Sequence, residues 1–496
     1  MMILLTSVLA SILWIAFYIL NEWLLRWRAP PGSELPPMPP TTSIRGHVEL
    51  LRRDFHRTEC LEWAKEYGPV IRLKINLLDV VILNDYDNIK KFCNTKEILW
   101  RSHSFVGCRD NYRGVGQLNG EAWTANRRYC LSMLRDLGFA KTAMEGHMME
   151  EFRRVAESIG ETNGKPVNLN GYVMPCTFNN LVSFFYGDLF THDHPTRSKL
   201  HRLMQRVGLT LFSDCGSPIP AKESTASAGV DSFHQRLSRR TSKVGNRLKY
   251  TRRLNVAVKA SDFINGYIKK IEESRDQPNP LFTDGYLVGN VNSFLMAGTF
   301  SATMAMTWQM INFAKNIDTV QARVQREIDE VIGQERMPTW EDRKKMPYTL
   351  ACVWENERWK TGAPLGVARE CAEDVVVGDY FIPKATIVLP NIWAVHNDPS
   401  LWKDPAKFKP ERYLSEGAET RFHKPENLIP FSIGQRACAG ETFARMEIFL
   451  FITFLLQRYD VVAEPPIEFD LDSPEITLSD ISHIKLRFLR RDIGKI

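Results

Sequence analysis

The chain has 496 residues, of which 44% are hydrophobic and 25% are charged. These proportions are typical of a folded globular protein, and no internal repeat or low-complexity tract indicates a solenoid or a disordered chain. The formal net charge of +6 is too small to indicate nucleic-acid binding. A denser basic cluster at residues 236–253 is interpreted as a solvated surface, with contact to anionic lipid headgroups as the alternative.

The N-terminus is strongly apolar. The stretch Ile3–Leu20 contains no charged side chain, and with residues 23–25 it approaches the ~20 residues that span a bilayer. Arg26 and Arg28 follow directly, so the positive-inside rule places the rest of the chain in the cytosol. We expect residues 1–28 to form a single-pass membrane anchor. A cleaved signal peptide is the alternative, although a basic start and a clear cleavage site are lacking.

Prolines dominate residues 29–44, which contain three Pro-Pro pairs. Proline restricts the backbone and removes an amide donor, so this segment is predicted to be a stiff hinge. Residues 45–496 are then predicted to form one large domain. Within it, residues 70–83 alternate in the manner of a β-strand.

The nine cysteines are scattered and form no Cys-x-x-Cys pair. This spacing argues against a disulfide scaffold or a zinc site and favours a reducing compartment.

Cys438 has an unusual setting. Gly434 and Gly440 flank it and allow the backbone to approach a flat partner closely. The apolar helical pattern of residues 442–459 begins just after it, so free amides and the positive end of a helix dipole face the sulfur. Arg436 could pair with an anionic group on the same partner. A thiolate held in this way suits iron in a macrocycle.

The segment from Phe431 to Gly440 resembles the haem-binding FxxGxRxCxG signature of the cytochromes P450, with every fixed position present. The resemblance implies that Cys438 is the axial ligand of the haem iron. It also implies that Phe431, Gly434 and Arg436 contribute to haem binding. It extends over essentially the whole chain after the hinge, and is closest to the animal microsomal group with drug- and steroid-metabolising members.

Two further motifs resemble those of the family. Glu355 and Arg358 match its ExxR, an acid–base pair on one helix face, and Arg412 lies in a segment similar to its PER motif. The resemblance implies that these three residues form a buried network that locks the scaffold, because either charge would be costly to bury alone. An exposed helical ion pair is the alternative.

Trp123 and Arg127 resemble the family's WxxxR, whose side chains bind the haem propionates. The same positional match implies that Arg101, Arg369 and Arg436 are further propionate partners. Two carboxylates in a partly buried cleft need such cations. Each arginine taken singly could instead be a surface residue.

Residues 297–301 depart from the family pattern. Ala297 and Gly298 match it, but Phe300 replaces the acid and Ser301 replaces the threonine. In the family this acid–alcohol pair relays protons during oxygen activation. Ser301 retains a hydroxyl, whereas Phe300 cannot carry a proton. We expect monooxygenase activity to be retained. Without the acid, coupling of electron supply to product formation is expected to be poor, and to improve in Phe300→Asp or Phe300→Glu. The alternative is that Phe300 only packs the helix while a water chain supplies protons by another path.

The resemblance implies a mainly α-helical P450 fold with a small β-rich N-terminal lobe, preceded by the transmembrane helix. Residues 45–496 would be the haem-thiolate catalytic domain. The implied reaction inserts one oxygen atom of dioxygen into a lipophilic substrate such as a steroid, a fatty acid or a xenobiotic. The alternatives are a haem-thiolate isomerase or dehydratase that needs no external electrons, and a non-catalytic haem- or lipid-binding protein.

The chain carries no flavin or nucleotide fingerprint of its own, so electrons are expected from outside. The resemblance implies NADPH and the flavin of NADPH–cytochrome P450 reductase as their source, with cytochrome b5 as a further candidate. Arg128 and Arg135, on the Trp123 helix, could steer an acidic reductase. The expected location is the endoplasmic reticulum membrane, with the catalytic domain in the cytosol and no nucleic-acid partner.

Overall fold

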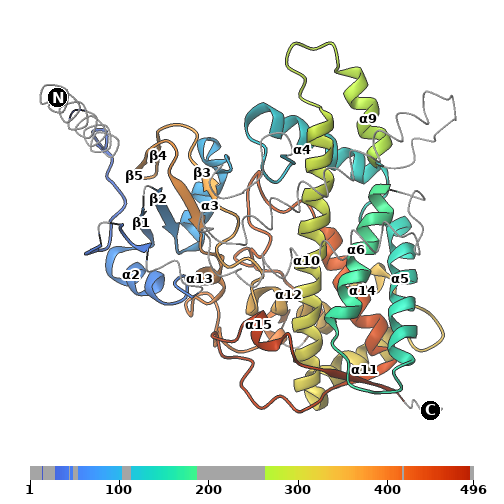
Figure 1. The fold of residues 1–496 in the computed structure, drawn as a ribbon. Helices are drawn as coiled ribbons and strands as arrows, with labels where there is room; N and C mark the ends of the chain where they lie inside the picture. Colours follow the sequence, from blue (N-terminus) through green and yellow to red (C-terminus); the bar gives the residue numbers. More distant parts are fainter. Residues whose placement is uncertain are drawn as a thin grey trace, which may run out of the picture. The chain divides into compact units, whose positions relative to one another are not determined.

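The fold is taken from a computed structural model that describes residues 14, 28–43, 45–48, 54–76, 78–102, 113–186, 263–415 and 418–491. The chain divides into two compact units, drawn in Figure 1. The first, here called the sheet unit, comprises Met1–Ser102, Leu365–Asn391 and Ile433–Arg436. The second, the helical unit, comprises His103–Pro364, Ile392–Ser432 and Ala437–Ile496.

The sheet unit is built on four strands in the order β1-β2-β6-β3. Their bounds are β1 Val70–Ile75, β2 Leu78–Leu83, β6 Ile387–Pro390 and β3 Arg369–Glu370. β1 pairs with β2 antiparallel, β2 with β6 parallel, and β6 with β3 antiparallel. Every residue of β6 is buried, as expected for a strand with neighbours on both edges and cover on both faces.

The alternating stretch at residues 70–83 forms a hairpin rather than one strand. Ile75 lies opposite Leu78, and Asn76 between them has a φ of 53°. Asparagine enters this left-handed region more readily than most residues, which allows the chain to reverse here. The predicted β-structure is therefore present, but it is divided into β1 and β2.

Other elements of the sheet unit are α2 (Glu59–Tyr67), α3 (Tyr86–Asn94), the short helix η2 (Lys96–Ile98) and the hairpin β4 (Val375–Val377) to β5 (Tyr380–Ile382). The proline-rich segment 29–44, expected to be a hinge, makes main-chain bonds within this unit. The amide of Glu34 donates to the carbonyl of Asp379, and that of Arg72 to the carbonyl of Pro37, each at 2.8 Å.

The helical unit contains most of the helices. They are α4 (Gly120–Asp136), α5 (Thr142–Gly160), α6 (Asn170–Tyr186), α9 (Phe263–Glu273), α10 (Asp284–Lys315), η5 (Ile317–Gln321), α11 (Ala322–Val331), η6 (Trp340–Lys345), α12 (Pro347–Trp359), α13 (Ile392–His396), η7 (Pro410–Tyr413), α14 (Glu441–Leu456) and α15 (Leu478–Ile481). The helical unit also contains two small antiparallel sheets. One pairs β7 (Leu414–Ser415) with β8 (Ala418–Phe422), and the other pairs β9 (Tyr459–Ala463) with β10 (Leu486–Arg490).

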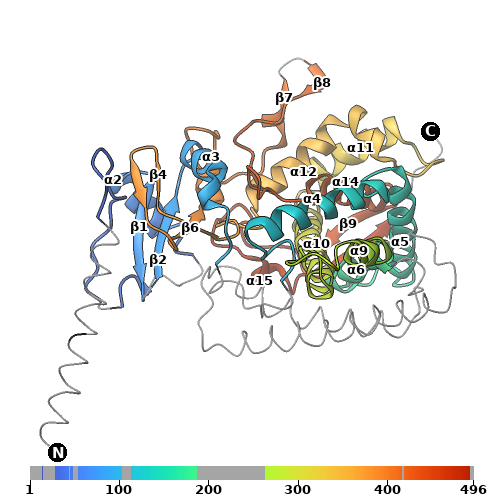
Figure 2. The same cartoon turned by 90° about the horizontal axis from the view of Figure 1, so that it is seen from above.

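Helix α10 is the longest of the described elements, with 32 residues, and runs through the helical unit beside α6 (Figures 1 and 2). The side chain of Thr283 caps its first turn by accepting the amide of Tyr286 at 3.1 Å. Its residues are buried throughout from Leu287 to Asn292 and from Met306 to Ala314, whereas Ala297 and Ser301 near its middle are exposed. Because most of the helix is buried, its sequence shows no single apolar stripe.

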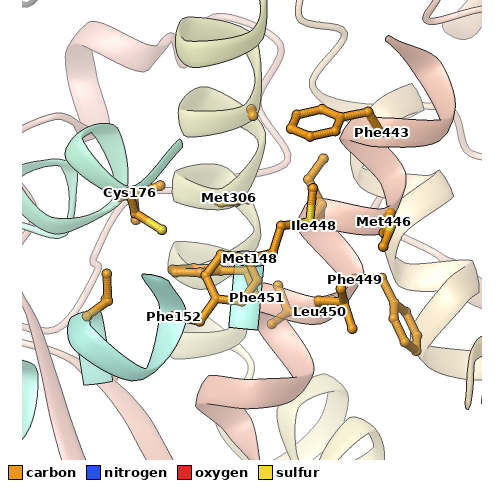
Figure 3. Packing of buried hydrophobic residues seen from close by; sticks show 14 of the residues in the cluster. Met148, Phe152, Cys176, Met306, Phe443, Met446, Ile448, Phe449, Leu450 and Phe451 are labelled. Atoms are coloured by element: carbon orange, nitrogen blue, oxygen red, sulfur yellow. The ribbon is translucent and has the colours of Figure 1, made fainter. Parts of the chain in front are cut away.

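The main core lies where α5, α6, α10 and α14 meet. Figure 3 shows Phe152 of α5, Cys176 of α6 and Met306 of α10 facing the aromatic and aliphatic side chains of α14. The rings of Phe152 and Phe451 meet edge to face, with centroids 5.5 Å apart. The apolar pattern predicted over residues 442–459 corresponds to α14, which ends at Leu456 and is followed by β9.

The prediction of a mainly helical fold with a small β-region is confirmed. Within the described part of the chain, no helix is both long and apolar enough to cross a membrane. The predicted anchor, residues 1–28, lies outside that part except for Trp14 and Arg28, and the basic cluster at 236–253 lies wholly outside it.

Candidate functional site

Cys438 lies just before α14 in the helical unit. Its amide donates to the carbonyl of Phe431 at 2.9 Å, which closes the loop between them. The amide of Gly440 points at the sulfur, with N and Sγ 3.3 Å apart. Among the free cysteines that the structure describes, Cys438 alone is exposed. An accessible sulfur with a backbone donor beside it is arranged as a thiolate ligand would be.

The atoms packed around the Cys438 sulfur raise the pKa of the thiol, while the Gly440 amide and the Arg127 guanidinium act in the opposite direction. Arg127 reaches this loop from α4, where its Nη2 donates to the carbonyl of Ala437 at 2.6 Å. Its guanidinium carbon lies 6.0 Å from the centroid of the Trp123 ring. Helix α4 thus brings the predicted Trp123 and Arg127 beside the Cys438 loop.

Three buried arginines of the sheet unit, Arg101, Arg369 and Arg436, are linked through the backbone. Each donates to a main-chain carbonyl in the segment that carries another of the three. Arg101 donates to the carbonyls of Val367 and Ala368 at 2.6 and 2.8 Å. Arg369 donates to the carbonyl of Ile433 at 3.1 Å. Arg436 donates through Nε to the carbonyl of Leu99 at 2.7 Å.

Gly434 also belongs to the sheet unit and has a φ of +76°. A Cβ atom at this position would lie 2.5 Å from the carbonyl oxygen of Cys93. Glycine is therefore required both by its backbone conformation and by the close approach of the segment that carries Cys93. Arg369 donates to the same Cys93 carbonyl at 2.9 Å, which links the glycine to the arginine group.

Ala297 and Ser301 are exposed on one face of α10, one helical turn apart. The Ser301 hydroxyl donates to the carbonyl of Ala297 at 2.6 Å. Gly298 faces α6 instead, because a Cβ there would lie 2.6 Å from Cδ1 of Leu181. The small residue at 298 thus allows α10 and α6 to pack closely.

Phe300 lies on the buried side of α10. It is 4% exposed and belongs to the main hydrophobic core. The carbonyl of its neighbour Thr299 accepts the Thr303 hydroxyl at 2.7 Å, and Thr303 lies 3.1 Å from the Thr177 hydroxyl of α6. Phe300 and Ser301, adjacent in sequence, therefore occupy different environments.

A family model for cytochromes P450 matches residues 36–482. The chain belongs to the cytochrome P450 family. It is similar to human cytochrome P450 2J2, with 29% identity over 490 residues, 95% of this chain and 93% of that protein. It is also similar to cytochrome P450 2M1 of Oncorhynchus mykiss, with 31% identity over 474 residues covering 92% and 91% of the two chains. Cytochrome P450 2C23 of Rattus norvegicus is 30% identical over 471 residues, 91% of this chain and 92% of its own.

This cytochrome P450 is a haem-dependent monooxygenase that acts on lipophilic substrates with electrons from a redox partner. The family and its relatives support this function rather than the isomerase or non-catalytic alternatives. The residues fit the cofactor: an accessible thiol with a backbone donor, and buried guanidinium groups suited to carboxylates.

The scaffold motifs of this P450 come together as a buried network in the helical unit. Arg358 donates to both carboxylate oxygens of Glu355, at 2.8 and 2.7 Å, and neither side chain has any exposed surface. Arg412 donates to the same carboxylate at 3.1 Å. A buried carboxylate with two guanidinium partners is well satisfied, so α12 is fixed to the segment around Arg412.

Two members of the network were missed from the sequence. The Tyr413 hydroxyl donates to Glu355 at 3.0 Å; its position next to Arg412 was the available signal. The carbonyl of His396 accepts from Arg358 at 2.8 Å, and its imidazole accepts the amide of Ile429 at 3.0 Å. Burial, reinforced by the Arg358 charge, lowers the pKa of His396 to about 3, so its ring is neutral. His396 lies in the family-like segment that leads to Arg412, but it was not singled out there.

Proposed function

We propose that Cys438 is the thiolate ligand of the haem iron. The observation that carries this proposal is the exposed sulfur with the Gly440 amide 3.3 Å away, at the start of α14. When bound, haem supplies the chemistry that activates dioxygen and transfers one oxygen atom to the substrate. The Gly440 amide stabilises negative charge on the sulfur, and the Arg127 guanidinium adds to this effect.

Trp123, Arg127, Arg101, Arg369 and Arg436 are proposed to bind the two propionates. Arg369 is buried and its burial lowers the pKa of its guanidinium, a cost that an anionic partner would offset. Guanidinium groups suit this task because their planar forks match carboxylates.

Ser301 is proposed to hold and pass a proton at its Oγ on the substrate side of α10. Its exposure and its bond to the Ala297 carbonyl support this role, since a hydroxyl fixed as a donor at one side can accept from water at the other. Phe300 takes no part in proton transfer. Its burial in the core supports a packing role.

Electrons are proposed to come from NADPH through NADPH–cytochrome P450 reductase, with cytochrome b5 as a second donor. Arg128 and Arg135 are exposed on α4, the helix that carries Trp123 and Arg127, and supply positive charge for an acidic partner. Residues 1–28 are proposed to anchor the protein in the endoplasmic reticulum membrane, with the catalytic domain in the cytosol. Steroids, fatty acids and xenobiotics are the proposed substrate classes.

The experiment is turnover by the full-length protein reconstituted with reductase and lipid, screened against these three substrate classes under labelled dioxygen. The expected product carries one oxygen atom from dioxygen and forms only with NADPH and reductase. Product that forms without NADPH, or whose new oxygen comes from water, would contradict the proposed reaction.

A further inference from the structure

Glu357 and Arg445 form an ion pair outside the haem signature and outside the Glu355 network. Glu357 lies in α12 and Arg445 in α14. Arg445 donates to the Glu357 carboxylate through Nη2 at 2.8 Å and through Nε at 3.1 Å. Only 5% of the Glu357 side chain and 12% of the Arg445 side chain are exposed. Two donors from one planar guanidinium fix the carboxylate in place.

The same guanidinium faces Phe431, the first residue of the haem signature. Its carbon lies 4.9 Å from the centroid of the Phe431 ring, within the range of a cation–π contact. The Phe431 carbonyl in turn accepts the amide of Cys438 at 2.9 Å. Contacts therefore run from Glu357 through Arg445 and Phe431 to Cys438, all within the helical unit.

A second carboxylate shares Arg445 but is less buried. Glu441 accepts from Nη1 of Arg445 at 2.6 Å and also pairs with Lys424 at 3.0 Å. Its side chain is 35% exposed. Solvent and Lys424 weaken the effect of the Glu441 charge on Arg445. Glu357 is therefore the main buried carboxylate that neutralises the Arg445 charge.

We propose that Glu357 and Arg445 are positioning residues for the thiolate ligand. The ion pair holds the Phe431 ring and so fixes the loop that ends at Cys438, and it also balances charge beside the sulfur. This inference rests on the proposed role of Cys438. The Glu357 charge acts on the Cys438 sulfur. If it is removed, the surroundings of the ligand become more positive, which favours the reduced haem.

The test uses the haem-loaded full chain with Glu357→Gln, Arg445→Lys, and the double variant Glu357→Gln/Arg445→Gln. Two properties are measured: the haem reduction potential, and the rate at which the red-shifted Soret band of the reduced carbon monoxide complex is lost on warming. Glu357→Gln is expected to raise the potential. It should also speed loss of the band on the order of tenfold, because removing one partner of a buried ion pair is strongly destabilising.

The other two variants separate charge from position. Arg445→Lys keeps the charge but loses the planar fork and the face over Phe431, so it should speed loss of the band with little change in potential. The double variant removes both charges and should return the potential toward the wild-type value.

Glu327→Gln is the matched control. Glu327 is partly buried and accepts the amides of Tyr348 and Thr349 at the start of α12, at 3.0 and 2.8 Å. The Glu327→Gln variant should have a lower melting temperature and an unchanged haem reduction potential. An unchanged potential and an unchanged rate in Glu357→Gln would overturn the inference. If the wild type itself lacked the red-shifted band, the role of Cys438 would be refuted instead, so the two failures are distinguishable.

Discussion

Arg436 donates through its Nε to the main-chain carbonyl of Leu99, 2.7 Å away, although the two residues are 337 positions apart in the chain. This bond completes a cycle in the sheet unit, because Arg101 bonds the segment before Arg369, and Arg369 bonds the carbonyl of Ile433. The three guanidinium groups are thereby held in place by the backbone itself. Preformed positive charge of this kind lowers the cost of binding a dianionic cofactor.

Arg436→Gln is expected to reduce the haem content of the purified protein, with Arg436→Lys intermediate. Hydrogen bonds to charged groups are typically worth about 1.5–3 kcal/mol, and Lys lacks the fork that both holds Leu99 and meets a carboxylate. The ratio of Soret to protein absorbance measures the effect. Arg487→Gln, in the exposed pair with Glu464, is the control. Full haem content in Arg436→Gln would exclude the residue from haem binding.

Arg358→Lys is expected to destabilise the fold by about 1–3 kcal/mol, because lysine keeps the charge of the fully buried pair but leaves buried acceptors without a donor. Lysine cannot donate to both Glu355 oxygens while also reaching the carbonyls of His396 and Pro405, which Arg358 bonds at 2.8 and 2.7 Å. Urea unfolding followed by circular dichroism measures the loss. Arg153→Lys is the control, since Arg153 also lies three residues after its glutamate, Glu150, but in an exposed pair. Equal effects of the two substitutions would refute the scaffold role.

Ser301→Ala should lower the amount of product formed per NADPH consumed, with a matching rise in hydrogen peroxide. General acid–base assistance is typically worth ~10²–10⁴-fold, so its loss should be visible. Thr303→Val is the control because that hydroxyl lies on the buried side of α10. Unchanged coupling in Ser301→Ala would show that protons arrive by another path.

Phe300→Asp is expected to lower the yield of folded protein, not to improve coupling. The Phe300 side chain is in the core, where an unpaired carboxylate is costly. A folded Phe300→Asp protein with better coupling would show that this position can reach the reacting side of the helix.

The buried carboxyl group of Glu447 predicts a pH dependence of stability. Its only bond within the described residues is from Nδ2 of Asn180 at 2.7 Å, and burial raises its pKa to about 8. Because folding raises this pKa, the protonated carboxyl group stabilises the folded state fully at pH values below the pKa of the unfolded chain. This stabilisation is lost as the pH rises through the pKa of the folded protein. The wild type should therefore lose stability between roughly pH 5 and 8 relative to Glu447→Gln, as measured by urea unfolding across that range. A constant difference between the two proteins would contradict the raised pKa.

The sequence predicted the site best where function depends on spacing along the chain. Cys438 lies at the start of a helix, and Glu355 and Arg358 are three residues apart on one helix face, so motif and geometry coincide. Pairings between distant segments could not be read in this way. His396 and the Glu357–Arg445 pair depend on how α12, α13 and α14 pack, which local periodicity does not determine.

The other differences between the sequence-based predictions and the structure concern the direction of a side chain or of the chain itself. Successive helical residues point about 100° apart, so adjacent positions 300 and 301 need not share a role. The departure from the family pattern at Phe300 showed which residue changed, but not that its side chain enters the core. Similarly, the alternation over residues 70–83 indicated strand structure but not the reversal at Asn76, because the pattern continues across it.

Ligation of the haem iron by Cys438 is tested by the absorbance spectrum of the reduced carbon monoxide complex of the full-length protein, compared with Cys438→Ala. Thiolate ligation predicts a strongly red-shifted Soret band in the wild type and its loss in the variant. Cys176→Ala, which removes a buried cysteine from the core, is the control and should retain the band. A red-shifted band that persists in Cys438→Ala would show that another residue binds the iron and would contradict ligation by Cys438.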